Sequence, residues 1–273
     1  MMESIGAAII NYVDPDKNFS GYTDGWAFTD FTTAATIIIS YVAFVFIGTK
    51  VMKTGGFSAM DPYPIKFIYN VSQIFLCSYM SIEAALLAYR SSYTLHCNDY
   101  INDNPPIANI LWLFYISKIW DLWDTIFIVI GKKWRQLSFL HVYHHASIIF
   151  VCWFNINLQY DGDVFLTIFL NSFIHTIMYT YYFICMHTKD TKTGKHLPIW
   201  WKSSLTMLQM IQFMTMMVQA TAQYLFSGEC TAHNSAVTAF YFYYVLLMLG
   251  LFLNFFVVNY IKPKKKKKMS KAE

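Results

Sequence analysis

The chain has 273 residues, of which 56% are hydrophobic and only 13% are charged. Its mean hydropathy is positive, at +0.37. A soluble domain carries about a quarter charged residues, so this composition argues against a soluble globule and favours a protein embedded in a lipid bilayer.

The first segment, residues 1–31, contains acidic residues and a single lysine where a secretory signal would carry a basic region. We therefore expect no cleavable signal peptide and a short lumenal or interfacial segment. It includes the sequon "NFS" at Asn18–Ser20, whose use the sequence alone does not decide.

Seven apolar runs follow, each close to the roughly 20 residues that an α-helix needs to cross about 30 Å of hydrocarbon. They lie near 32–49, 67–88, 107–130, 139–159, 164–186, 203–226 and 236–261. All prolines fall outside these runs, and the alternating strands of a β-barrel are absent. We predict an all-α integral membrane fold of seven transmembrane helices in one domain (32–261), with a Lys-rich tail (262–273).

The basic residues predict the orientation of these helices. Except for Lys17, Arg90 and Lys118, every lysine and arginine follows the first, third, fifth or seventh run. Positively charged loops stay in the cytosol, so we expect a lumenal N-terminus and a cytosolic C-terminus.

The five cysteines divide into two groups. Cys77, Cys152 and Cys185 lie inside the runs and are expected to be small apolar fillers. Cys97 and Cys230 lie in two lumenal loops, where an oxidising compartment would allow a disulfide between them; two free thiols are the alternative.

Charged residues interrupt the third run. Lys118, Asp121 and Thr125 have the spacing i, i+3 and i+7 of one helix face, with Asp124 on the neighbouring turn position. Charges in a membrane span are costly unless paired or wetted, so they face a bundle interior and indicate function. A Lys118–Asp121 ion pair that only locks helix packing is the simpler interpretation, and it does not exclude a role in a site.

Histidines repeat this pattern in the next two runs. His141, His144 and His145 share one side of the fourth run near its cytosolic end, and His175 lies at a similar depth in the fifth, with Asn171 on its face. Gln209 and Gln212 lie in the cytosolic half of the sixth. These polar groups predict one cavity that opens to the cytosol.

Two chemistries could use such a cavity. Histidine clusters bind metals, and a membrane di-iron desaturase or hydroxylase is the alternative, although it needs more histidine boxes than these runs contain. Without a metal, a neutral histidine can attack a thioester and hold the acyl group, while a second imidazole or amide stabilises an oxyanion. We favour the second chemistry and expect no metal site and no bound cofactor.

Four motifs then carry a specific resemblance. They are "KIWDLWDT" (Lys118–Thr125), "HVYHH" (His141–His145), "NSFIHTIMYTYY" (Asn171–Tyr182) and "TMLQMIQ" (Thr206–Gln212). Their order and spacing resemble those of the ELO family of very-long-chain fatty acid elongases over nearly the whole chain. "FLHVYHH" and "MYTYY" are most similar to its polyunsaturated branch, particularly the algal elongases that act on C18 Δ6-unsaturated chains.

The resemblance implies a bundle around an acyl-chain tunnel and a condensation of acyl-CoA with malonyl-CoA in the endoplasmic reticulum membrane. It implies that His144 takes the acyl group, that His141 and His145 orient it, and that His175 and Asn171 polarise the malonyl thioester. The expected substrate-binding residues are Lys118, Asp121, Asp124, Asn171, Tyr179, Gln209 and Gln212, with Lys132, Lys133 and Arg135 for coenzyme A phosphates.

The same resemblance implies transient contact with the ketoacyl reductase, dehydratase and enoyl reductase of the elongation cycle, and no nucleic-acid partner. The chain departs from the family at Asp121, where the usual residue is glutamate, which puts a direct contact there in doubt. Its tail also lacks a strict dilysine retrieval signal, because Ser270 and Met269 precede Lys271.

Overall fold

The computed structural model describes residues 2–13, 22–98, 104–158, 162–188, 199–226 and 235–261, and within them every regular element is a helix. The elements are α1 (Met2–Val13), α2 (Phe31–Thr54), α3 (Tyr63–Arg90), α4 (Ala108–Trp120), α5 (Leu122–Ile130), α6 (Phe139–Asn157), α7 (Val164–His187), α8 (Lys202–Leu225), α9 (Ser235–Phe256) and the π-helix η1 (Val257–Ile261). The all-α prediction is confirmed.

Each predicted apolar run coincides with a helix, and the third coincides with two. α4 and α5 meet at Asp121, whose N–H still bonds to the carbonyl of Ser117 at 2.9 Å. Asp121 keeps right-handed helical dihedrals (φ −59°, ψ −17°), so the two helices follow one another as one rod. The predicted charged residues lie on both sides of this junction.

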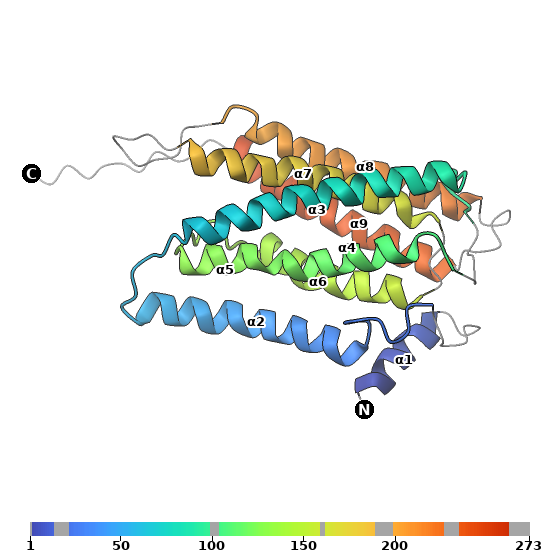
Figure 1. Ribbon diagram of the computed structural model, residues 1–273, viewed down its shortest axis with the longest axis horizontal. Helices are drawn as coiled ribbons and strands as arrows, with labels where there is room; N and C mark the ends of the chain where they lie inside the picture. Colours follow the sequence, from blue (N-terminus) through green and yellow to red (C-terminus); the bar gives the residue numbers. More distant parts are fainter. Residues whose placement is uncertain are drawn as a thin grey trace, which may run out of the picture.

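The helices run nearly side by side along the long axis of the molecule (Figure 1). Their contacts close a ring in which α3 packs on α7, α7 on α8, α8 on α9, α9 on α6, and α6 on α4, which returns to α3. α2 lies outside this ring and packs on α5 and α6. The polar residues of the third, fourth and fifth predicted runs therefore belong to neighbouring helices.

α1 is a helix that the sequence analysis did not predict within residues 1–31. It docks against the start of α2, where Glu3 accepts a hydrogen bond from the Thr32 N–H at 2.7 Å. Gly6 makes the close approach possible, because a β-carbon there would lie 2.6 Å from Phe31 Cβ. Ile10 is fully buried on the same side.

Five helical stretches are long and apolar enough to cross a membrane: α2, α3, α6, α7 and Ala236–Ile261. α4 and α5 are individually too short, at 13 and 9 residues, and α8 is interrupted by several glutamines. The chain is thus a multi-pass, all-α membrane protein. The count of seven spans stays a prediction.

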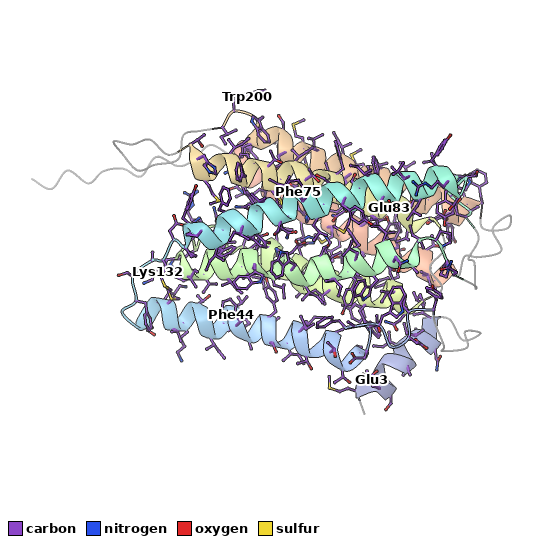
Figure 2. The ribbon with its side chains drawn as sticks, viewed as in Figure 1. Glu3, Phe44, Phe75, Glu83, Lys132 and Trp200 are labelled. Carbon is purple, nitrogen blue, oxygen red and sulfur yellow. The ribbon has the colours of Figure 1, made fainter. Side chains whose placement is uncertain are left out.

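Basic residues gather at one end of the bundle. The loops that follow α2 and α5 lie at this end (Figure 1), and Figure 2 shows Lys132 there, whereas Glu3 and Glu83 lie toward the other. Lys66, at the start of α3, pairs there with Asp61. The charge asymmetry seen in the sequence is therefore an asymmetry between the two ends of the folded bundle.

A buried carboxylate organises the opposite end. Asp163, at the start of α7, accepts hydrogen bonds from the N–H groups of Cys97 (2.9 Å) and Asn98 (3.1 Å), the Asn98 side chain, and the Gln223 amide of α8 (2.9 Å). Cys97 is disulfide-bonded, while Cys77, Cys152 and Cys185 form no disulfide. Cys230, the predicted partner of Cys97, lies outside the described residues, as do Asn18 and the tail 262–273.

Asp163→Asn should destabilise this end of the molecule. The amide nitrogen of asparagine cannot accept a hydrogen bond, so some of the buried donors lose their acceptor, at a cost of about 3 kcal/mol. Denaturant unfolding in detergent measures the loss. Asp30→Asn is the control because asparagine caps α2 as well as aspartate does; equal unfolding of both variants would contradict the role of Asp163.

Candidate active site

The three histidines in the first turns of α6 face the interior of the ring of helices. Ser138 caps the helix by accepting the His141 N–H at 3.2 Å, which begins the helix directly before the histidines. The ring centroids of His141 and His145 are 4.3 Å apart, and those of His144 and His145 are 5.7 Å apart. The predicted cluster on one helix side is present.

His141 is fixed from two other helices. Its Nε2 lies 2.8 Å from the hydroxyl of Thr125 on α5, and that hydroxyl lies 3.1 Å from the Tyr41 hydroxyl of α2. Thr125 is fully buried. His141 is therefore an anchored residue, which fits the orienting role expected for it better than a reacting one.

Lys118 joins the α4–α5 rod to α7. Its Nζ lies 3.3 Å from Asp121 Oδ2 and donates to Asn171 Oδ1 at 2.9 Å. Lys118 and Asp121 are each only 2% exposed. The predicted ion pair therefore exists, and it also holds the amide of Asn171 in place.

A second set of hydrogen bonds links Asp121 to α3 and α7. Asp121 Oδ1 accepts from Gln73 Nε2 at 2.6 Å and from the Tyr179 hydroxyl at 3.0 Å. The Tyr179 hydroxyl also lies 2.9 Å from Asp124 Oδ2 and 3.2 Å from the hydroxyl of Tyr69. The shorter side chain at the usual glutamate position thus makes direct contacts to Gln73 and Tyr179, while its contact with substrate stays a prediction.

His175 completes the cluster from α7. It is buried, its Nδ1 lies 3.8 Å from Asp121 Oδ2, and its ring centroid is 5.9 Å from that of Tyr179. His175 and the α6 histidines therefore approach the Lys118–Asp121 pair from two helices. The polar residues expected to share a cavity thus lie together in one cluster, and the cavity itself stays a prediction.

Three imidazole nitrogens in this cluster have no assigned bond. Nδ1 of His144, His145 and His175 is buried and has no hydrogen-bond partner within the described part of the chain. Buried polar atoms are normally bonded, so an exception calls for an explanation. Free nitrogens of neutral histidines are the atoms that a nucleophile or a hydrogen-bond donor to substrate requires.

Other predicted residues lie outside these hydrogen bonds. Gln212 is buried, but its amide contacts the sulfur of Met216 on its own helix, and the amide of Gln209 reaches the Met178 sulfur at 4.0 Å. Lys132, Lys133 and Arg135 lie between α5 and α6 and are partly or fully exposed. These three basic residues lie at the end of the bundle where α6 begins.

Sequence reasoning missed Gln73, Tyr69 and Tyr41 as members of the cluster. Gln73 carried a signal, because Lys66, Asn70 and Gln73 have the spacing i, i+4 and i+7 of one face of a long apolar helix. The tyrosines carried none, since tyrosine is common in this chain. Their roles follow only from the packing of α2 and α3.

No described group of three or more His, Cys, Asp or Glu residues has an arrangement that could hold a metal ion. Two surface hollows, of about 520 Å³ along α1 and about 310 Å³ at the start of α3, contact none of the cluster residues. The site is therefore defined by the side chains of the cluster rather than by these hollows.

A family model described as "ELO: GNS1/SUR4 family" matches residues 26–268. The chain belongs to the ELO family. It is 32% identical to very long chain fatty acid elongase 2 of Rattus norvegicus over 253 residues, 90% of this chain and 86% of that protein. It is 35% identical to human very long chain fatty acid elongase 4 over 240 residues (83% and 71%), and 29% identical to human elongase 1 over 238 (84% and 82%).

These similarities confirm the family resemblance and extend over most of each relative. They do not distinguish the algal polyunsaturated branch, which stays a prediction for this ELO chain. The family identity also favours the elongase interpretation over the di-iron alternative.

Lys118→Met should destabilise the ELO bundle by about 3–5 kcal/mol, because it leaves the Asp121 carboxylate buried without its cation. The double variant Lys118→Met/Asp121→Asn should lose less than the sum of the single losses, since it also removes the charge. Unfolding of all three variants in detergent gives the coupling energy. Additive losses would show that the pair does not interact.

Proposed function

We propose that this chain is the condensing enzyme of fatty acid elongation, which joins a long-chain acyl-CoA to malonyl-CoA and releases CO2 and CoA. The observation that carries the proposal is the set of unbonded nitrogens on His144, His145 and His175 beside the buried Lys118–Asp121 pair. Membership of the ELO family and the names of its relatives point to the same chemistry.

In the first half-reaction, a nitrogen of His144 attacks the acyl thioester. The carbon–sulfur bond breaks, CoA leaves with the proton that the imidazole gives up, and an acyl-imidazole remains. His145 and the anchored His141 hold the His144 ring, because His141 is itself fixed by Thr125 at 2.8 Å. Burial away from water protects the acyl-imidazole from hydrolysis.

In the second half-reaction, malonyl-CoA loses CO2 and its electron pair forms an enolate. His175 and Asn171 stabilise the enolate oxygen, and the carbon attacks the acyl carbonyl. The new carbon–carbon bond replaces the bond to His144, which regains a proton. Lys118 supports this step by holding Asn171 at 2.9 Å, and Asp121 supports it by facing His175.

The substrates enter from the end that carries the basic residues. Lys132, Lys133 and Arg135 suit the phosphates of coenzyme A. Gln209 and Gln212 lie in the first half of α8. The acyl chain would run through the ring interior toward the Asp163 end. Sequence similarity of "FLHVYHH" and "MYTYY" to the polyunsaturated branch supports C18 polyunsaturated acyl chains as substrates.

We also propose that the chain crosses the endoplasmic reticulum membrane seven times, with α4 and α5 together forming one span and α8 another. α8 buries Gln212, Gln219 and Gln223 within the bundle, which allows an interrupted apolar helix to span. The product leaves toward the cytosol, where ketoacyl reductase, dehydratase and enoyl reductase would act on it.

His144→Ala should abolish malonyl-dependent product formation, with a loss of at least about 1,000-fold, because no other nitrogen replaces the nucleophile. The assay uses membranes, labelled malonyl-CoA, a panel of saturated, monounsaturated and C18 polyunsaturated acyl-CoAs, and a parallel sample with chelator. His96→Ala is the control, since His96 packs against Phe226 at the opposite end of the bundle.

Product from the polyunsaturated substrates that is indifferent to chelator and lost only in His144→Ala supports the proposal. No malonyl-dependent product with any acyl-CoA would refute the condensing reaction. Oxidation that the chelator abolishes would favour the di-iron alternative instead.

Orientation can be checked with two matched arginines. Arg135 follows α5 and Arg90 ends α3, and both are exposed. In microsomes, Arg135→Cys should react with an impermeant maleimide at once, and Arg90→Cys only after permeabilisation, in a Cys185→Ser background. The reverse order would mean that the N-terminus is cytosolic.

A further inference from the structure

Two carboxyl groups one helical turn apart share a single tyrosine hydroxyl. Tyr179 OH lies 3.0 Å from Asp121 Oδ1 and 2.9 Å from Asp124 Oδ2. Asp121 has the cation Lys118 at 3.3 Å, and the mechanism above uses it. Asp124 takes no part in that mechanism, so its partly buried carboxyl group needs a separate explanation.

The contacts around Tyr179 favour an additional proton in this group. The oxygen of Tyr179 is in contact with three other oxygens, those of Asp121, Asp124 and Tyr69, the last at 3.2 Å. The two tyrosine hydroxyls supply only two hydrogens for these three contacts. The third contact is satisfied if a carboxyl group is protonated, and two carboxylates that share one site commonly hold one proton between them.

The proposed reaction consumes one proton in each cycle. The first half-reaction is balanced, because the proton lost by the imidazole leaves with CoA. In the second, decarboxylation of a carboxylate gives CO2 and a carbanion, and the bond from the acyl carbon to His144 breaks with its electron pair on nitrogen. That nitrogen must gain a proton that neither substrate brings.

We propose that Asp124, acting through Tyr179, is the store of this proton, an inference that rests on the proposed condensing function. The Asp124 carboxyl gives its proton to the Tyr179 oxygen, and the Tyr179 hydroxyl gives its own proton to Oδ1 of Asp121. The Asp121 carboxyl rotates and passes this proton to Nδ1 of His175, and the imidazole then releases the proton on its other nitrogen to the departing nitrogen of His144. Asp124, which is only partly buried, regains a proton from cytosolic water.

The geometry supports the part of this path that runs from Asp124 to His175. Asp121 Oδ2 lies 3.8 Å from the unbonded Nδ1 of His175, so a small closure on substrate binding completes that contact. Gln73 Nε2 donates to Asp121 Oδ1 at 2.6 Å, which holds this carboxyl group in place, and lies 3.1 Å from the Tyr179 oxygen. In this proposal Asp124 and Tyr179 position a proton, which differs from the substrate-binding role that the family resemblance implies for them.

The test separates the two half-reactions. Asp124→Asn keeps a donor to the Tyr179 oxygen but cannot release an acidic proton. With C18 acyl-CoA alone, rapid-quench measurement of CoA release should give a wild-type burst in the variant, within about twofold. After addition of malonyl-CoA, its single-turnover condensation should be about 100-fold slower, the lower range for loss of an acid catalyst.

Further variants keep the test independent of folding. Tyr179→Phe leaves both carboxyl groups but interrupts the path, so it should show the same split, and Asp124→Glu should recover part of the condensation rate. Two control variants remove a carboxyl group and a tyrosine hydroxyl far from the cluster. Asp30→Asn changes the cap of α2, and Tyr241→Phe removes a hydroxyl that lies 2.7 Å from the Thr167 hydroxyl. Neither control should change either half-reaction.

Wild-type condensation in Asp124→Asn would overturn the proton store, because a structural contact survives this change. Equal losses of burst and condensation in Asp124→Asn and Tyr179→Phe would also overturn it and assign the pair to packing. Wild-type protein that condenses without any CoA burst would instead refute the acyl-histidine route, and this proton step with it.

Discussion

The burial of Lys118 against Asp121 is the constraint on which the rest of the site depends. A lysine and a carboxylate in a membrane interior cost several kcal/mol unless both are fully bonded. The bundle meets this requirement with Asn171 from α7 at 2.9 Å and Gln73 from α3 at 2.6 Å. Because only one axial register satisfies all four groups, the ion pair fixes how α3, the α4–α5 rod and α7 slide past one another.

The same rod fixes the histidine helix from its other side. Thr125 follows Asp121 by one helical turn and bonds to His141, while Tyr41 of α2 supports Thr125. The α4–α5 rod therefore positions two neighbouring helices. Lys118 and Asp121 set the position of α7 and His175, and the Thr125 hydroxyl, after the junction, sets the position of α6. Through Tyr41, the packing of α2 on the outside of the helix ring also contributes to the geometry of the candidate active site.

Much of this arrangement could be predicted because charges and histidines are conspicuous in apolar runs. Lys118, Asp121 and the histidines were found from spacing alone, and they do converge. Gln73 escaped because an amide in a helix is less unusual than a charge, and the tyrosines escaped because their hydroxyls act only when packing brings them to a carboxyl group. The α1 helix was missed for a related reason, since it is held by docking of Gly6 against Phe31 rather than by a strong apolar pattern of its own.

The two ends of the bundle show how structure and chemistry are separated. At one end, the Asp163 carboxylate receives donors from a loop and from α8. At the other, the carboxylates are bonded as well, yet Nδ1 of His144, His145 and His175 is left without a partner. Stability alone favours the first arrangement, because an unbonded buried nitrogen costs about 1–3 kcal/mol. The bundle bears this cost at three neighbouring histidines, where binding of a substrate can offset it and direct the interaction energy to the reacting atoms.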